Sequence, residues 1–356
     1  MKILLLFFSL TALGTQPDSL DKQVNVLHDN IISIDTHNDF AMMYAFPEEE
    51  TTVTKGQVSF ELMKKGRLDA AFFAAYQAQG PRTEEGHMIA KERADIMLTS
   101  LHRYVAENAA LGGIALSAED VKTLKAQGKA ALILAIENAY CLGNDLSLVE
   151  HYYNMGVRMI GITHNGNNEL ADAATDPVTE HGGLSGFGCR VIREMNRLGM
   201  IVDISHASRL ACLQAVRISE TPVMASHSGV YNLKSIPRNL TDEEIIAIAS
   251  RGGLIQVSIG RYFLSTLPKS EVGLDHLIEH INYVVDLVGI DHVGIGSDFD
   301  GGGGVNGCEN MGEMKSITRA LMLEGYSGDE IGKLWGDNVL RVMEEVRKHA
   351  RSFQQF

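Results

Sequence analysis

The sequence predicts a single-domain α/β protein built as a (β/α)8 barrel, and three observations carry this prediction. The chain has 356 residues, 45% of them hydrophobic, so it can bury one large core. Eight short apolar runs alternate with helical patterns, which favours a parallel sheet. Several of these runs lead into a His, Asp or Glu, and a (β/α)8 barrel gathers such residues at the carboxyl ends of its strands.

The apolar runs are short and rich in aliphatic residues, as is typical of strands that are buried on both faces. The predicted strands lie near residues 31–36, 69–75, 131–136, 157–162, 201–205, 222–226, 254–258 and 293–297. A doubly wound open sheet is the alternative. To bind a nucleotide it would need a glycine-rich phosphate turn after the first strand, and residues 35–38 do not form one.

Helix signals fill the gaps between these strands. Residues 117–120 and 241–244 resemble capping boxes, in which a Ser or Thr and a later acidic residue satisfy the first N–H groups of a helix. Periodic apolar positions predict helices over 187–198 and 273–288, and a last helix begins at Ser327.

The charge balance excludes some classes of partner. The chain carries 31 basic and 45 acidic residues, a net charge of −14, which argues against nucleic acid and against an anionic membrane surface. Beyond the amino terminus no segment is long and apolar enough to span a bilayer, so we expect no stable membrane insertion of the mature chain. The oligomeric state stays open, a homodimer included.

Residues 1–14 have the features of a signal peptide. Lys2 precedes an apolar run over residues 3–10, and residues 12–14 have the small-x-small pattern of a cleavage site. We therefore expect residues 15–356 to form the barrel domain and the protein to be exported, either periplasmic or secreted. A retained membrane anchor is the alternative, but the run is short of the ~20 residues that a span needs.

The four cysteines give no metal motif. They are Cys141, Cys189, Cys212 and Cys308, and none forms a CxxC pair. Export permits disulfides, but their pairing cannot be read from the sequence, and free buried thiols fit equally well.

Five residues at the predicted strand ends form a candidate metal site. His37 and Asp39 alternate, so their side chains point to one side of an extended segment, and imidazole and carboxylate both bind zinc. Glu137 follows six apolar residues, where a carboxylate is costly to bury unless it meets a cation, and it can bridge two ions. His206 and His227 each follow a strand and could bind a second ion.

Each of these residues alone has a simpler structural reading, as a helix cap, a salt-bridge partner or a hydrogen-bonded loop histidine. Together they favour a two-metal site that holds a hydroxide at neutral pH. Asp298, at the end of the last predicted strand, would then transfer protons, whereas Asp300 is expected to face away. Gly301–Gly304 follow directly, which predicts a loop at the same face.

Longer motifs resemble those of the membrane (renal) dipeptidase family. The most specific is residues 184–206, LSGFGCRVIREMNRLGMIVDISH. Shorter matches are residues 226–228 (SHS), 238–243 (RNLTDE), 296–301 (GSDFDG) and 336–342 (GDNVLRV). The resemblance covers residues 30–345, nearly the whole mature chain.

The resemblance implies a binuclear zinc (β/α)8 barrel that hydrolyses dipeptides through a metal-bridging hydroxide. It implies that His37 and Asp39 bind one zinc ion, that His206 and His227 bind the other, and that Glu137 bridges the two. Manganese or cobalt would also suit these ligands, so zinc itself is inherited from the family.

The resemblance also assigns residues that contact the substrate. His164 would contact the scissile carbonyl of the dipeptide, Arg238 would hold its C-terminal carboxylate, and Asp298 would be the catalytic acid and base. The loop after Asp300 departs from the family, because glycines replace a Pro-x-Gly-type segment beside the substrate pocket. The apolar lipid-anchor tail of animal members is also absent, which favours a soluble exported form.

Two other functions remain as alternatives. One is a related metal-dependent amidohydrolase acting on N-acyl amino acids or lactams. The other is a metal-bearing binding protein on a catalytically degenerate scaffold, but all the expected ligands and Asp298 are present.

Overall fold

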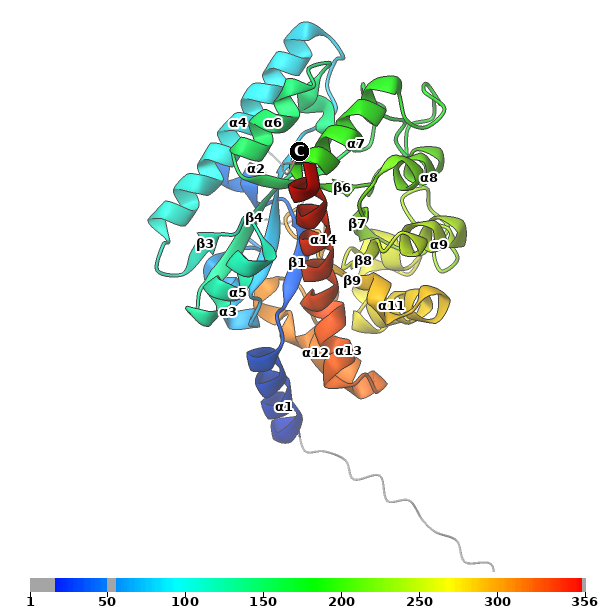
Figure 1. Ribbon diagram of the computed structural model, residues 1–356. Coiled ribbons are helices and arrows are strands. Elements are labelled where there is room, and N and C mark those ends of the chain that lie inside the picture. Colours follow the sequence, from blue (N-terminus) through cyan, green and yellow to red (C-terminus); the bar gives the residue numbers. More distant parts are fainter. Residues whose placement is uncertain (1–16, 50–55, 354–356) are drawn as a thin grey trace, which may run out of the picture.

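The computed structural model describes residues 17–49 and 56–353, so the signal peptide predicted at residues 1–14 lies outside the described residues. The described residues form a nearly closed barrel of parallel strands surrounded by helices (Figure 1). The strand order around the barrel is β1-β2-β4-β5-β6-β7-β8-β9, and β3 pairs with β4 beside this path. The predicted (β/α)8 fold is therefore confirmed.

All eight predicted strands are present. Their bounds are β1 (Ile34–Asn38), β2 (Ala70–Tyr76), β4 (Ala130–Glu137), β5 (Val157–Gly161), β6 (Ile201–Asp203), β7 (Met224–Ser228), β8 (Leu254–Ser258) and β9 (Val293–Gly296). The short strand β3 (Gly112–Ile114) is not among the predicted elements.

Helices follow most strands and cover the outside of the barrel. They are α1 (Pro17–Asn30), α2 (Phe40–Ala45), α3 (Phe60–Gly66), α4 (Glu84–Glu107), α5 (Ala118–Ala126), α6 (Ser147–Asn154), α7 (Gly186–Leu198), α8 (Arg209–Ile218), α9 (Asp242–Ser250), α10 (Arg261–Leu264), α11 (Leu274–Val288), α12 (Lys315–Glu324), α13 (Gly328–Gly332) and α14 (Asn338–Phe353). Short 3-10 turns are η1 (Ala139–Leu142), η2 (Lys269–Glu271), η3 (Ile290–His292) and η4 (Met311–Glu313), and η5 (Lys333–Asp337) is a π-helical turn.

The predicted capping boxes form, with one difference. Glu244 Oε2 accepts a hydrogen bond from Thr241 N at 2.9 Å, which caps α9 as expected. At α5, Ser117 Oγ accepts from Asp120 N, but the Asp120 carboxylate reaches back to Leu116 N rather than to Ser117 N. Both helices therefore begin where the sequence predicts.

Side chains alternate between the inside and the outside of the barrel. In β4, Ile133 and Ala135 belong to the buried cluster inside the barrel, whereas Leu132 and Leu134 pack under the outer helices. The same period of two directs Glu137 inward at the carboxyl end of the strand. The position of Glu137 in β4 therefore places its carboxylate in the barrel interior.

The barrel closes between β1 and β9. Asp39 N donates to Phe299 O at 2.9 Å. One layer lower, the buried Asp35 carboxylate accepts from both the backbone N and the Oγ of Ser297, each at 2.6 Å. Burial raises the pKa of Asp35 to about 6. This closure fixes the chain on either side of His37.

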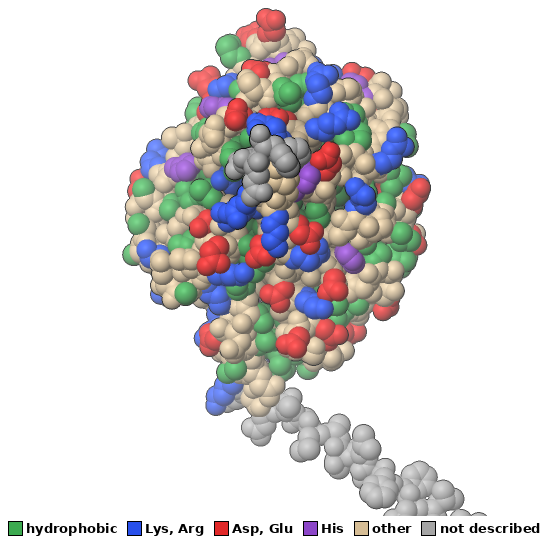
Figure 2. Space-filling model, viewed as in Figure 1, with side chains coloured by type: hydrophobic (Ala, Val, Ile, Leu, Met, Phe, Trp, Pro, Cys, Tyr) green, Lys and Arg blue, Asp and Glu red, His purple; other side chains and the backbone are tan. Residues whose placement is uncertain are grey.

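Helix α14 covers the amino ends of the strands. Its Val339, Val342 and Val346 share a buried cluster with Ile34 and Ile201, which begin β1 and β6. Figure 1 shows α14 crossing in front of the ring of strands, and Figure 2 shows acidic and basic side chains interspersed over the same face. The carboxyl ends of the strands therefore open on the opposite side.

The helix predicted to begin at Ser327 is present but irregular, because η5 separates α13 from α14. A Cβ on Gly336 would lie 2.1 Å from the carbonyl oxygen of Ile32, so only glycine lets this turn approach the chain before β1. Asn338 then donates to Ile290 O at 2.8 Å and fixes the start of α14.

Two further predictions concern the membrane and the cysteines. In the part of the chain that the structure describes, no helix is both long and apolar enough to cross a bilayer. All four cysteines are free thiols, and Cys141, Cys212 and Cys308 are buried.

A buried histidine links α1 to α12 and η5. His28 Nδ1 lies 3.0 Å from Arg67 O, and His28 Nε2 lies 2.7 Å from Thr318 Oγ1. Thr318 Oγ1 in turn accepts from Trp335 Nε1 at 2.8 Å, so its own proton goes to His28. These bonds fit a neutral ring with its proton on Nδ1. Burial lowers the pKa of His28 to about 4.

We expect His28 to make folding sensitive to acid. Because its folded-state pKa lies below the unfolded value of about 6.5, its stabilising effect is complete above pH 6.5 and is lost as the pH falls toward 4. Between pH 7 and pH 5 this loss should be about 2 kcal/mol. Denaturant unfolding should show a smaller loss of unfolding free energy between pH 7 and pH 5 for His28→Gln than for wild type. The exposed His102→Gln variant is the control, and an unchanged pH dependence in His28→Gln would contradict the assignment.

Candidate metal centre

The carboxyl end of the barrel brings the predicted ligands together. In the described residues, three groups have ligand-type atoms within 4.8 Å of one another. The groups are His37 with Glu137 and His227, Glu137 with His164 and His206, and His37 with Asp39 and Asp298. The ligands lie at the last positions of the strands or just beyond them.

Glu137 lies at the centre of this cluster. Its Oε1 is 3.0 Å from His206 Nε2 and 3.4 Å from His227 Nε2. Its Oε2 faces the other side, 3.7 Å from His37 Nε2. Burial raises the pKa of Glu137 well above its ordinary value. One oxygen of this carboxylate faces His37 and the other faces His206 and His227, so the carboxylate has the geometry to be shared between two cations.

Hydrogen bonds behind His206 and His227 determine which ring nitrogen faces the cluster. Ser226 Oγ donates to Asp203 Oδ2 at 2.7 Å and lies 2.9 Å from His227 Nδ1, so it accepts the Nδ1 proton. His206 Nδ1 lies 3.1 Å from Asn165 Oδ1, which can only accept. Both rings therefore carry their proton on Nδ1 and present a lone pair on Nε2.

These two Nε2 atoms face each other at 3.1 Å. Two lone pairs at this distance repel each other unless a cation or a proton lies between them. Burial lowers the pKa of both His206 and His227 well below the ordinary value, and the positive charge of Arg238 lowers both further, so a proton is disfavoured. The arrangement fits a divalent cation.

His37 gives a second test of the fit. Both of its ring nitrogens and Asp39 Oδ1 are buried and form no hydrogen bond with any described residue. Buried polar atoms without partners are rare in native proteins. Burial lowers the pKa of His37, but Glu137, Asp39 and Asp298 outweigh it and raise the pKa to about 10. Imidazole nitrogens and carboxylate oxygens in this arrangement are donors that suit zinc and similar ions.

Two irregularities in the sheet bring His37 and His227 together. The register of β1 against β2 shifts between Asp35 and Asn38, and that of β7 against β8 shifts between Ala225 and Ser228. Each shift adds one residue to the strand that carries the histidine, which is the effect of a β-bulge. The two rings stack with their centroids 3.8 Å apart.

Asp298 and Asp300 follow β9 but face different neighbours. Burial raises the pKa of Asp298 to about 7, and the residue adopts a left-handed φ of 61°. A Cβ on Gly301 would lie 2.0 Å from Asp39 Oδ2 and 2.5 Å from Asp298 Oδ1, so only glycine fits against the two carboxylates. Asp300 instead accepts a hydrogen bond from Gln57 N at 3.0 Å, away from the cluster as expected.

His164 lies beside the metal-type cluster. Its ring centroid is 4.2 Å from that of His206, and the ring of Tyr76 meets it edge-on at 4.8 Å. Burial lowers the pKa of His164 to about 3, and Arg238 lowers it further, so the ring is neutral. A ring nitrogen of His164 also lies within 4.8 Å of a Glu137 carboxylate oxygen, a placement that the sequence does not predict.

Arg238 is buried on the loop between β7 and α9. Its Nη2 donates to His227 O at 3.0 Å, and its guanidinium lies 5.1 Å from the ring centroid of Phe263. Its Nε has no hydrogen-bond partner among the described residues. Burial lowers the pKa of Arg238 to about 10, so it stays charged near neutrality.

Sequence reasoning missed the residues that support the cluster, although signals for some of them exist. Ser226 directly precedes His227, and Asp203 lies three residues before His206. Alternation along β2 would have directed Tyr76 into the barrel, in register with Glu137.

Comparison with known proteins identifies the family to which the chain belongs. A family model described as membrane dipeptidase, peptidase family M19, matches residues 21–355. The dipeptidase aclJ of Aspergillus oryzae is 34% identical over 334 residues, which cover 89% of this chain and 79% of that protein. The dipeptidase tcpJ of Claviceps purpurea is 32% identical over 332 residues, which cover 89% and 78%.

Solved structures agree with this family. The probable dipeptidase PvdM from Pseudomonas aeruginosa is 31% identical, with a TM-score of 0.88 over 94% of this chain and 100% of that one. A metallo peptidase from Rhodobacter sphaeroides, liganded with a phosphinate mimic of the dipeptide L-Ala-D-Ala, is 25% identical, with a TM-score of 0.80 over 89% and 99%. The chain therefore belongs to the membrane dipeptidase family, peptidase family M19, and is a metal-dependent dipeptidase.

Proposed function

We propose that this protein is an exported zinc dipeptidase with two zinc ions per chain. His37 and Asp39 would hold one ion, His206 and His227 would hold the other, and Glu137 would serve both. The observation that carries this proposal is the position of the buried Glu137 carboxylate, with one oxygen toward His37 and the other toward the facing Nε2 atoms of His206 and His227. The signal-peptide pattern of residues 1–14 supports export.

The residues around the ions have separate roles in the reaction. When bound, two divalent cations supply an activated water and a Lewis acid for the amide carbonyl. Asp298 takes a proton from the attacking water and delivers it to the leaving amine. Its carboxylate lies beside His37 and Asp39, next to the position of the attacking water, where a carboxylate can relay a proton.

Two further residues act on the substrate itself. The neutral ring of His164 donates an N–H to the carbonyl oxygen, where negative charge develops in the transition state. Arg238 binds the C-terminal carboxylate, because a guanidinium matches a carboxylate with paired hydrogen bonds. Its bond to the backbone of His227 keeps this carboxylate site beside the metal ligands, which favours substrates of two residues.

Peptidase assays with matched substrates test this function. We expect the purified protein to cleave L-Ala-L-Ala or L-Ala-D-Ala, the latter because of the Rhodobacter relative, and a chelator to abolish the cleavage. The C-terminal amide should be roughly 10- to 100-fold poorer in kcat/KM, because a charged hydrogen bond is worth about 1.5–3 kcal/mol. Metal analysis should find two zinc ions per chain. If only N-acetylated dipeptides were cleaved, the protein would be an amidohydrolase of N-acyl amino acids instead.

Asp298→Asn should separate catalysis from metal binding. We expect kcat to fall by roughly 100- to 10,000-fold, the usual range for loss of a general acid–base, with the metal content unchanged. Asp300→Asn is the matched control, because Asp300 has a similar φ of 60° and its bond from Gln57 N survives the change. Equal losses in the two variants would point to damage to the loop rather than to a proton-transfer role.

Ser226→Ala should weaken the metal centre without touching a ligand. The change removes the bond that holds His227 Nδ1 and leaves Asp203 Oδ2 without its hydroxyl donor. Loss of such a supporting bond usually costs roughly 10- to 100-fold in metal affinity or activity. Competition with a chelator measures the affinity. Ser228→Ala is the control, because the buried Ser228 hydroxyl has no partner among the described residues, and wild-type affinity in Ser226→Ala would refute the assignment.

A further inference from the structure

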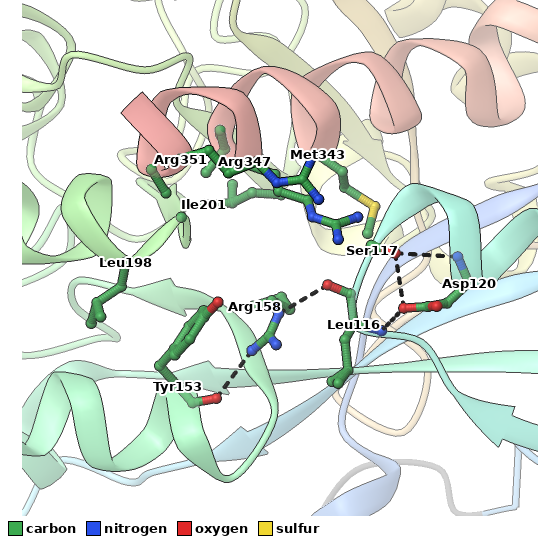
Figure 3. A pocket seen from close by; sticks show the side chains of 13 residues that line it. Leu116, Ser117, Asp120, Tyr153, Arg158, Leu198, Ile201, Met343, Arg347 and Arg351 are labelled. Carbon is green, nitrogen blue, oxygen red and sulfur yellow. Dashed lines mark hydrogen bonds between the residues drawn. The ribbon is translucent and has the colours of Figure 1, made fainter. Parts of the chain in front are cut away.

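A cavity of about 450 Å³ lies at the opposite end of the barrel from the metal-type residues. It lies between α5, the start of β5 and β6, and the last turns of α14 (Figure 3). Nothing in the peptidase function uses this cavity. Its volume falls within the range of small-molecule sites in proteins, about 300–1,000 Å³.

Arg158 is held rigidly in the wall of this cavity. Its Nε donates to Leu116 O at 3.0 Å, and its Nη1 donates to Tyr153 O at 3.1 Å, as Figure 3 shows. The guanidinium stacks over the Tyr153 ring at 4.2 Å from the centroid. Its Nη2 makes no hydrogen bond with a described residue, so one donor group of an ordered arginine remains for a ligand.

Two further arginines face the same cavity from α14. Arg347 and Arg351 are four residues apart, so they lie on one side of the helix. Within residues 17–49 and 56–353 neither forms a hydrogen bond or an ion pair. Burial lowers the pKa of Arg158, Tyr153 and Asp120 raise it, and the charge of Arg347 lowers it, so the two guanidinium groups lie close enough to repel each other.

The cavity does not balance these charges. Asp120 is the one acidic residue among those that line it. Its carboxylate already accepts from Leu116 N and from Ser117 Oγ, each at 2.9 Å, and so caps α5. Three arginines therefore meet a single acid, and one oxygen of that acid is already held at the start of α5.

The remaining wall of the cavity is apolar. Leu116, which is 43% exposed, and the half-buried Leu198 present apolar surface to the cavity, whereas Ile201, Met343 and Val346 line it but are buried and present almost none. An inorganic anion would satisfy the arginines but would leave this surface without a partner. A molecule with an oxyanion at one end and an apolar body would satisfy both parts of the cavity.

We propose that this cavity binds a small amphiphilic carboxylate. The carboxylate lies between Arg158 and Arg347, and the apolar chain lies along Leu116 and Leu198. The ligand stands apart from the dipeptide substrate, because it meets the amino ends of the strands rather than the metal-bearing ends.

Calorimetric titration with three probes tests the proposal on the full mature protein. Octanoate carries both features of the ligand, 1-octanol carries only the apolar chain, and inorganic phosphate carries only the anion. We expect octanoate to bind at least roughly tenfold more tightly than either of the others, because a charged hydrogen bond contributes about that factor. If octanol bound as tightly as octanoate, the cavity would not be an anion site. If phosphate bound as tightly as octanoate, the ligand would not need an apolar chain.

Paired variants on α14 locate the binding. Arg347→Gln should weaken octanoate binding by roughly 10- to 100-fold, because it removes one charged partner of the carboxylate. Lys348→Gln makes the same charge change on the same helix outside the cavity, at a side chain that is 74% exposed, and should leave the binding unchanged. Unliganded melting temperatures check that both variants fold. Octanoate binding that survives Arg347→Gln, or that falls equally in Lys348→Gln, would refute the proposal.

Discussion

The structure depends most on one costly group, the buried carboxylate of Glu137. A carboxylate at the top of a barrel core loses its hydration and is tolerated only with compensating charge close by. Three imidazoles surround it: His37 approaches one oxygen, whereas the neutral His206 and His227 point their Nε2 lone pairs toward the other and supply no positive charge. Because two of those rings point lone pairs at each other, the compensation is incomplete without cations. The requirement for metal is thus a consequence of how this carboxylate is buried.

Several features of the barrel follow from holding imidazoles around Glu137. The bulges in β1 and β7 rotate two histidines inward where regular alternation would not bring both to one point. The chain from Asp203 through Ser226 then fixes the tautomer of one ring, and Asn165 fixes that of another. The orientation of the metal ligands therefore depends on hydrogen bonds from residues that do not themselves face the cluster.

The sequence predicts what depends on local pattern. The eight strands follow from short apolar runs, and Glu137 can be placed inside because alternation continues to the last residue of β4. Contacts between distant strands lack such a pattern, so the bulges, the Asn165–His206 pair and the Tyr76–His164 contact are not predicted. His164 and Arg238 lie on loops, where periodicity gives no information, and only the family resemblance singles them out.

The two ends of the barrel differ in how a bound molecule can act. At the carboxyl ends, ligand-bearing loops and bulges surround the reacting groups. At the amino ends, α14 packs on the first residues of the strands, and Arg158 and Ile201 lie near the start of β5 and β6. The paired strands β5 and β6 separate these positions from His164 and Asp203 at the other end of the barrel. An anion in the arginine cavity would thus stabilise the native barrel by mass action, without any need to alter the metal centre.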